Sequence, residues 1–314
     1  MNKKTIVIGH LNPDTDTVCS AIVYAWYLNK KGIDCAAYVA GDVNKETSFV
    51  LDKFGFKQPE ILKQIEADRN VHIVDTNNKD ELISGIENAD IDSIVDHHLL
   101  YGNISSNKPI NIIIKPYGCT ATILYEQITK EGIALDKDIA SLMLSCILSD
   151  TLNLTSPTTT QVDKTAVEDL ENLTGESAND LSASMFEAKS DLAGFSAKDL
   201  ILMDSKVSDF AGKTYRVSVL ETTKPKNSID MQDELEKEIE NLNKQENNEA
   251  TFLFVIDIIK MNATLLAGDS AVKETALKIW GNKAVLKEGG KVIEIEGVVS
   301  RKKQIIPMLK EFFG

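Results

Sequence analysis

The chain has 314 residues, more than one small domain usually holds, which suggests two domains. Its formal net charge of −14 gives a surface that repels nucleic-acid phosphates, and no long basic stretch offsets that charge. We therefore expect no nucleic-acid partner. Hydrophobic residues make up 43% of the chain, enough for a sizeable core. No apolar run reaches the roughly 18 residues that a membrane-spanning helix needs, so we expect no membrane partner.

The four cysteines, Cys19, Cys35, Cys119 and Cys146, have the spacing of neither a redox pair nor a metal site. We interpret them as small buried residues of a protein in a reducing compartment. The apolar run near the N-terminus is too short for a secretory signal peptide. These features together predict a cytoplasmic protein.

Short runs rich in valine and isoleucine alternate with helical patterns over the first 150 residues. The runs predict strands at residues 5–9, 35–40, 71–74, 93–95 and 111–114. The helical patterns fall at residues 18–28, 47–54, 121–131 and 138–148. This alternation predicts an α/β fold with a doubly wound, mostly parallel sheet.

The pattern changes in the last third of the chain. Further helical segments reach about residue 189, and residues 190–196 have the composition of a linker. Beyond it, strands are predicted at residues 215–220, 251–259, 264–266 and 292–299, with one amphipathic helix at 228–249. We predict an N-terminal domain of residues 1–189, a linker of 190–196 and a smaller C-terminal α/β domain of 197–314 with a mixed sheet.

Histidines and aspartates gather where the predicted N-terminal strands end. Because the carboxyl ends of parallel strands share one edge of a sheet, clusters that are distant in sequence should converge there. One further aspartate follows the helix at 138–148. The set comprises His10, Asp14, Asp16, Asp75, Asp96, His97, His98 and Asp150.

Imidazole nitrogens mixed with carboxylate oxygens suit a divalent ion of the manganese, cobalt or magnesium type. The donors exceed what one ion needs and fit two ions that share a carboxylate, an arrangement that promotes displacement at phosphorus. Asp75 is the expected shared ligand because its strand should lie between the other two. We expect Asp96 to orient His97 or a neighbour rather than bind metal, and His72, inside a strand, to be structural.

A phosphate substrate also needs cationic partners, and the predicted C-terminal domain supplies them. Residues 300–304 read Ser-Arg-Lys-Lys-Gln directly after a predicted strand, and Lys206 follows the linker. We expect these cations to clamp a polyanion in an active site between the two domains.

The spacing His10-x-x-x-Asp14-x-Asp16 together with Asp96-His97-His98 resembles the DHH phosphoesterase superfamily. Residues 118–122 (Gly-Cys-Thr-Ala-Thr), 149–152 (Ser-Asp-Thr-Leu) and 300–304 narrow the resemblance to the family II, or manganese-type, inorganic pyrophosphatases. The resemblance spans essentially the whole chain. It implies an enzyme of phosphate metabolism that hydrolyses pyrophosphate to two orthophosphates.

The resemblance also implies a role for each matching residue. One Mn²⁺ (or Co²⁺) ion would be held by His10, Asp14 and Asp75, and the other by Asp16, Asp75, His97 and Asp150. A hydroxide bridging the two ions would be the nucleophile, and Mg²⁺ would arrive with the substrate. The residues that grip pyrophosphate would be His98, Lys206, Arg301 and Lys302, and His98 would be placed to protonate the leaving phosphate. The family is homodimeric through its N-terminal domain.

Three positions depart from the family pattern. Members commonly follow the shared aspartate with His-Asn-Glu, where this chain has Thr76-Asn77-Asn78, and many have lysine where Thr155 stands. These changes concern support of the metal ligands and one phosphate contact. Two alternatives remain: hydrolysis of longer polyphosphates or short oligonucleotides, and a binding protein that has lost catalysis. The net charge and the short basic segment favour a small polyanion, and the presence of every ligand candidate argues against lost catalysis.

Overall fold

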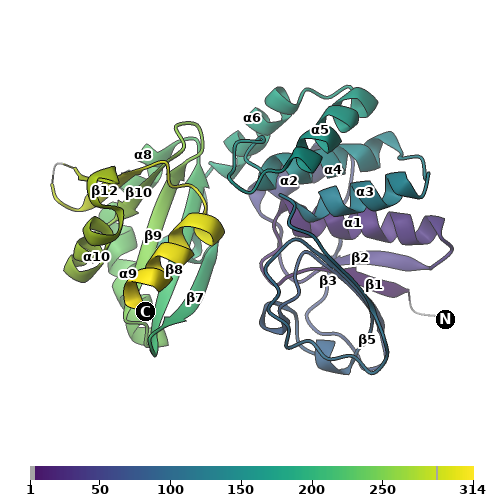
Figure 1. Ribbon diagram of the computed structural model, residues 1–314, viewed down its shortest axis with the longest axis horizontal. Helices are drawn as coiled ribbons and strands as arrows, with labels where there is room; N and C mark the ends of the chain where they lie inside the picture. The colour runs from purple at the N-terminus through teal and green to yellow at the C-terminus, as the bar shows by residue number, and fades with distance from the viewer. Residues whose placement is uncertain (1–3, 288) are drawn as a thin grey trace. The chain divides into compact units, whose positions relative to one another are not determined.

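The computed structural model describes residues 4–287 and 289–314. It divides into two compact units, Met1–Ala188 and Lys189–Gly314. Each unit is a β-sheet covered by helices (Figure 1), which confirms the predicted α/β class. No helix among the described residues is long and apolar enough to cross a membrane.

Six strands form the sheet in the described part of the first unit, in the order β3-β2-β1-β4-β5-β6, and every neighbouring pair is parallel. The strands are β1 (Thr5–Ile8), β2 (Cys35–Val39), β3 (Glu60–Ile61), β4 (Asn70–Val74), β5 (Asp90–Asp96) and β6 (Asn111–Ile114). The order confirms that β4 lies between β1 and β5. The two-residue β3 was not predicted because its exposed residues form no apolar run.

Helices cover one face of this sheet (Figure 1). They are α1 (Thr15–Lys30), α2 (Lys45–Lys53), α3 (Thr120–Lys130), α4 (Lys137–Asp150), α5 (Gln161–Thr174) and α6 (Ala178–Lys189). Helix α1 packs against α3 and α4 as well as the sheet, so most of its residues are buried. The other face buries Ile6, Ile73 and Ile94 against Leu82 and Ile86, from a segment that contains the short helical turns η1 (Lys79–Glu81) and η2 (Ile86–Asn88).

The second unit has a mixed sheet, as predicted, in the order β11-β12-β10-β9-β8-β7. Only the β8–β9 pair among these is parallel. The strands are β7 (Ser205–Phe210), β8 (Lys213–Thr222), β9 (Ala250–Asp257), β10 (Asn262–Leu266), β11 (Ala284–Leu286) and β12 (Val292–Glu296). The helices are α7 (Ala197–Leu202), α8 (Pro225–Asp230), α9 (Gln232–Glu246), α10 (Ser270–Trp280) and α11 (Ile306–Phe313), with the turns η3 (Gly281–Lys283) and η4 (Arg301–Ile305).

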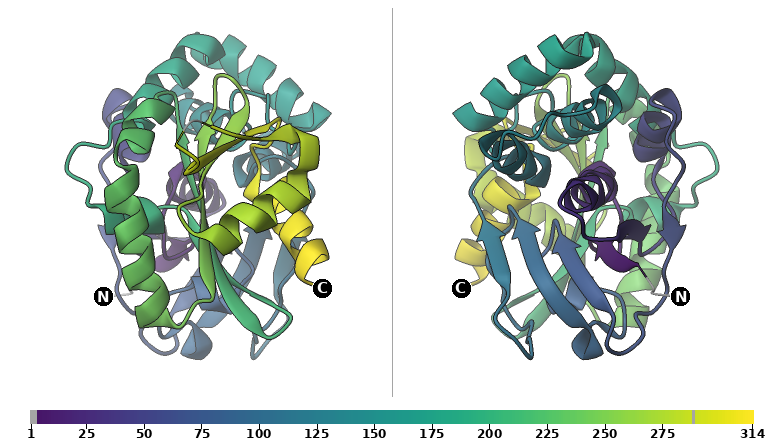
Figure 2. Two further views of the ribbon diagram at one scale, coloured as in Figure 1. Left: turned by 90° about the vertical axis from the view of Figure 1, so that its left-hand side faces the viewer. Right: turned by 90° about the vertical axis from the view of Figure 1, so that its right-hand side faces the viewer.

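Alternation along β9 builds two different cores in this unit. Leu253 faces a cluster of aliphatic residues from α7 and α9, such as Leu200 and Leu235. Phe252 and Phe254 point to the opposite face, where they contact Phe313 and Trp280. Figure 2 shows α9 on one side of this sheet and α10 on the other.

Three details of the second unit were wrongly predicted. The expected single helix at 228–249 is two helices, α8 and α9, because Met231 both ends the first and begins the second with φ −89° and ψ 8°. The expected strand at 292–299 ends at Glu296, where Gly297 turns the chain with a φ of 69°. Strands β7 and β11 were missed, because β7 is an outer strand with few apolar residues and β11, at the other edge of the sheet, has only three residues.

Gly85 provides a test of the packing beneath the first sheet. It has a φ of 92°, and a Cβ atom there would lie 2.0 Å from the carbonyl oxygen of Ile65. We expect Gly85→Ala to lower the free energy of unfolding by about 3 kcal/mol, since strain at positive φ adds to the steric clash. Urea denaturation measures the change.

Gly102→Ala is the matched control, because Gly102 has a φ of 75° and no atom within 4 Å of the added Cβ. It should cost only the backbone strain, about 1 kcal/mol. Equal losses in the two variants would show that the contact with Ile65 does not matter.

Candidate metal centre

The structure brings the predicted ligand candidates together at the carboxyl edge of the first sheet. Among the described residues, three groups of side chains have donor atoms within 4.8 Å of one another. The groups are His10 with Asp14 and Asp75, Asp16 with His97 and Asp150, and Asp75 with His97 and His98. All of these residues come from the set expected from the sequence.

Asp75 stands at the middle of the cluster, directly after β4. Its Oδ2 lies 3.3 Å from His10 Nε2, and its Oδ1 lies 3.5 Å from His97 Nε2. Thr17 Oγ1 donates to Oδ2 at 2.6 Å, and Thr120 Oγ1 donates to Oδ1 at 3.0 Å. The two oxygens of one buried carboxylate thus face two different imidazoles.

His10 and Asp14 form one side of the cluster. Asp14 is the N-cap of α1, where its Oδ1 accepts from Thr17 N at 2.9 Å and its Oδ2 lies 3.6 Å from His10 Nε2. Burial alone would lower the pKa of His10, but the charges of Asp14 and Asp75 outweigh it and raise this pKa. Burial would raise the pKa of Asp14, yet His10 holds it well below its usual value. Both side chains of this pair therefore favour their charged forms.

Asp16 lies in the first turn of α1 and is fully buried. Its carboxylate accepts from Ser20 Oγ at 2.6 Å and from the backbone N of Thr120, at the start of α3, at 2.7 Å. Burial, followed by the charge of Asp75, raises the pKa of Asp16 to about 7. A cation bound at this carboxylate near neutral pH would therefore displace a proton.

The two histidines after β5 are oriented differently. His97 Nδ1 lies 3.1 Å from the carbonyl oxygen of Tyr117, which can only accept, so Nδ1 donates and Nε2 carries the lone pair of the neutral ring. That Nε2 lies 3.4 Å from Asp150 Oδ2. His98 instead turns its Nδ1 to Asp96 Oδ1 at 2.8 Å. Asp96 thus orients His98, the neighbour of His97.

The chemistry of the donors fits divalent metal ions. The imidazole-to-carboxylate separations of 3.3–3.6 Å in this cluster are those of neighbouring ligands around one ion. They correspond to metal–ligand bonds of about 2.1 Å, a length typical of small divalent cations. A mixture of nitrogen and carboxylate oxygen is the donor set expected for manganese or cobalt.

Several polar residues that support the ligands were not predicted from the sequence. Thr17, Ser20 and Thr120 hydrogen-bond to the ligand carboxylates, and Asn77 Nδ2 donates to Asp96 Oδ2 at 2.5 Å. The signal available in the sequence was weak, because serine and threonine near a helix start usually serve as caps.

His72 is buried in β4 with its Nδ1 2.7 Å from Ser93 Oγ, and burial lowers its pKa, in keeping with a structural role.

The side chains that depart from the family pattern form local hydrogen bonds. Thr76 Oγ1 donates to Glu81 Oε2 at 2.9 Å, and Asn78 Oδ1 accepts from the backbone N of Asp80 at 3.2 Å. Thr155 Oγ1 donates to the carbonyl oxygen of Leu152 at 2.5 Å. Each of these bonds shapes a loop rather than contacting a ligand candidate.

The cationic candidates lie in the second unit. Lys206 is on β7, paired with Val217 of β8. Arg301 begins η4, and its Nη1 lies 2.6 Å from Asp204 Oδ1, so the basic segment adjoins the start of β7. Gln304 accepts from the backbone N of Val299 and of Ser300, each at 2.9 Å, and so fixes the turn that carries Arg301 and Lys302.

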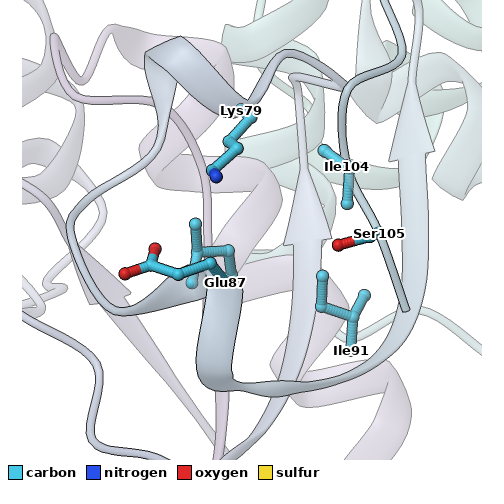
Figure 3. Close-up of a pocket in the computed structure, with 6 residues that line it drawn as sticks. Lys79, Glu87, Ile91, Ile104 and Ser105 are labelled. Carbon is cyan, nitrogen blue, oxygen red and sulfur yellow. The ribbon is translucent and has the colours of Figure 1, made fainter. Parts of the chain in front are cut away.

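A small hollow elsewhere in the first unit plays no part in this cluster. It has a volume of about 10 Å³ and is lined by Lys79, Ile86, Glu87, Ile91, Ile104 and Ser105 (Figure 3). Such a volume admits roughly one water molecule. None of its lining residues is a ligand candidate.

Comparison with known proteins gives a consistent result over the whole chain. Residues 4–147 match the model of the DHH family, N-terminal domain, and residues 183–312 match the DHHA2 domain. A protein of Archaeoglobus fulgidus that is assigned as a manganese-dependent inorganic pyrophosphatase is 38% identical, with 100% of this chain and 99% of the relative covered. One of Deinococcus radiodurans is 37% identical, with 98% of each covered.

Solved structures agree with these relatives. A crystal structure from Methanococcus jannaschii, assigned to the family II inorganic pyrophosphatases, is 32% identical with a TM-score of 0.83 over 98% of each chain. An exopolyphosphatase-related protein of Bacteroides fragilis has a TM-score of 0.51 at 14% identity over 99% of this chain and 91% of that one. This second likeness concerns the fold alone.

The raised pKa of Asp16 predicts how stability depends on pH when metal is removed. Its folded pKa of about 7 lies above the usual 3.8, so between these values the folded protein keeps a proton that the unfolded chain releases. Stability of the chelator-treated protein should therefore fall as the pH rises from about 4 to about 7. Asp16→Asn, which cannot titrate, should show a shallower fall in urea denaturation at stepped pH.

Asp138→Asn provides the control, because Asp138 is an exposed residue in the first turn of α4. It should keep the wild-type dependence. A wild-type dependence in Asp16→Asn would instead contradict the assigned pKa.

Proposed function

Because the chain belongs to the family of the manganese-dependent inorganic pyrophosphatases, and is an enzyme of that class, we propose that it hydrolyses pyrophosphate to two orthophosphates at the centre described above. The observation that carries this assignment is the position of Asp75. Its two oxygens face His10 and His97 respectively, as a carboxylate shared between two ions would require.

The proposed division of ligands follows the groups around Asp75. One Mn²⁺ (or Co²⁺) ion would be held by His10, Asp14 and Asp75, and the second by Asp16, Asp75, His97 and Asp150. Two such ions would supply Lewis acidity and a bridging hydroxide for attack at phosphorus. The Mg²⁺ ion would accompany the substrate. The protein holds the donors through its own hydrogen bonds, with Thr17 and Thr120 fixing Asp75 and Tyr117 fixing the tautomer of His97.

We assign His98 to the substrate rather than to a metal ion. Its Nδ1 lies 2.8 Å from Asp96 Oδ1 but 3.6 Å from Asp75 Oδ1, so this nitrogen pairs with the carboxylate of Asp96. The ring edge bearing Nε2 would then meet a phosphate oxygen. From there His98 would donate a hydrogen bond and protonate the leaving phosphate.

Lys206, Arg301 and Lys302 are proposed to bind the phosphate oxygens. A centre rich in carboxylates repels a polyanion, so cations are needed to offset this repulsion. The ion pair of Arg301 with Asp204 and the turn fixed by Gln304 support a preformed cationic segment in the second unit. An arginine held in this way offers a planar fork to phosphate.

We also propose a homodimer that forms through the first unit. Strand β6 is the outermost strand of its sheet, and Ile112 on it is 53% exposed. An exposed outer strand is a natural surface for a second copy of the chain.

An enzyme that hydrolyses pyrophosphate would act in cytoplasmic phosphate metabolism.

Phosphate release in the presence of Mn²⁺ tests the proposed reaction. Pyrophosphate should be hydrolysed faster than tripolyphosphate, a dinucleotide should not be hydrolysed, and a chelator should abolish turnover. Asp75→Asn should lower kcat by about 10³-fold or more, since it weakens both ions at once. Asp138→Asn should retain full activity. Turnover of the dinucleotide with none of pyrophosphate would overturn the proposal.

The role of the cationic segment has a separate test. Arg301→Gln should lower kcat/KM for pyrophosphate by about 10²-fold, because a charged partner of the phosphate is lost. Its Mn²⁺ affinity, measured by calorimetry, should equal that of the wild type. Lys303→Ala, which removes the exposed neighbouring charge, should change kcat/KM little. Equal weakening of metal binding and activity in Arg301→Gln would argue against a role toward substrate.

A further inference from the structure

One short segment, residues 117–120, contacts three of the proposed metal ligands. The carbonyl oxygen of Tyr117 accepts from His97 Nδ1 at 3.1 Å. The backbone N of Thr120 donates to Asp16 Oδ2 at 2.7 Å, and its Oγ1 donates to Asp75 Oδ1 at 3.0 Å. The ligands themselves come from α1 and from the residues that directly follow β4 and β5. The position of this segment therefore sets how three separate elements present their donors.

A buried carboxylate outside the ligand set holds this segment. Asp163, at the third position of α5, is 0% exposed. Both of its oxygens accept from the backbone N of Gly118, at 3.1 and 3.0 Å, and Oδ1 also accepts from Thr122 Oγ1 at 2.6 Å. Oδ2 accepts from Thr160 N at 2.7 Å and from Thr160 Oγ1 at 2.6 Å. Asp163 thus ties the start of α5 to the segment and to the first turn of α3.

Close packing at Gly118 keeps the segment in one place. A Cβ atom there would lie 2.7 Å from Thr151 Cγ2 and 2.9 Å from Asp163 Oδ2. Both distances are too short for real contacts, so only glycine lets the backbone reach Asp163. Thr151 directly follows the ligand candidate Asp150, so the same contact borders a fourth ligand.

We propose that Asp163 is a positioning residue for one of the two metal ions, a role that rests on the metal centre proposed above. Two of the three ligands touched by the segment, Asp16 and His97, are assigned above to the same ion, whereas in the described part of the chain the other ion would meet the segment only through the shared Asp75. Loss of Asp163 should consequently weaken the ion held by Asp16, His97 and Asp150 more than the ion held by His10 and Asp14.

Asp163→Asn is the main test, because it places an amide donor where four donors now converge. Its affinity for one of the two Mn²⁺ ions should fall about 10- to 100-fold, as is typical when a group supporting a ligand is lost, while the other ion binds as in the wild type. Calorimetry with Mn²⁺ alone measures the two affinities without reference to activity. At saturating Mn²⁺, kcat should recover and KM for pyrophosphate should stay near the wild-type value.

Two variants separate positioning from general stability. Thr160→Val removes the cap of α5 but leaves the bond from Gly118 to Asp163 in place. Asp199→Asn removes the same kind of capping box from α7, where Ser196 N and Oγ donate to Asp199 Oδ2 at 2.9 and 2.6 Å. Both should lower the melting temperature and leave both Mn²⁺ affinities unchanged.

Gly118→Ala decides the matter if Asp163→Asn does not fold, because it displaces the same segment while keeping the carboxylate. It should show the same unequal loss of Mn²⁺ affinity. Wild-type Mn²⁺ affinities in whichever of the two variants folds, or an equal loss of affinity for both ions, would overturn the role of Asp163. Failure of the wild type to bind two Mn²⁺ ions or to hydrolyse pyrophosphate would instead overturn the proposed function itself.

Discussion

Repulsion among buried carboxylates is the constraint on which this centre depends. Asp16 and Asp75 are almost completely buried within one cluster, where burial and the charges of neighbouring carboxylates both disfavour their ionisation. Hydroxyl groups, backbone N–H groups and imidazoles offset part of this cost, as Thr120 does for both Asp16 and Asp75. The remainder is visible in the raised pKa values of Asp16 and Asp75. A centre that is costly when empty is one that a divalent cation stabilises strongly.

The parallel sheet explains how these carboxylates come to meet. With β4 between β1 and β5, the three strands deliver their following residues to one edge. Asp75 turns away from β4 with a φ of 60°, a conformation that costs about 1–2 kcal/mol for a residue other than glycine. The starts of α1 and α3 then supply backbone amides to Asp14 and Asp16. In the second unit a different device, the turn fixed by Gln304, organises the cations.

The helices and strands that the sequence predicted correctly are those marked by apolar runs. The ligand candidates could be found because most of them closely follow such a run. Strand β7 and the break at Met231 were missed, because an outer strand has little apolar pattern and a helical pattern can continue across a break. The polar supports were missed for another reason. Thr120 lies 104 residues from Asp16, and Gly118 lies 45 residues from Asp163, so only the folded chain shows that they pair. The capping box of Thr160 with Asp163 can be predicted from sequence, but the hydrogen bonds from Asp163 to the segment at Gly118 cannot.

The central claim is that Asp75 joins two metal ions. Diffraction from crystals grown with Mn²⁺, measured with anomalous scattering at the manganese edge, tests this claim most directly. The account predicts two anomalous peaks per chain, one beside His10 and Asp14 and one beside Asp16, His97 and Asp150, with each Asp75 oxygen bound to a different ion. A single peak, or two peaks of which only one contacts Asp75, would contradict it.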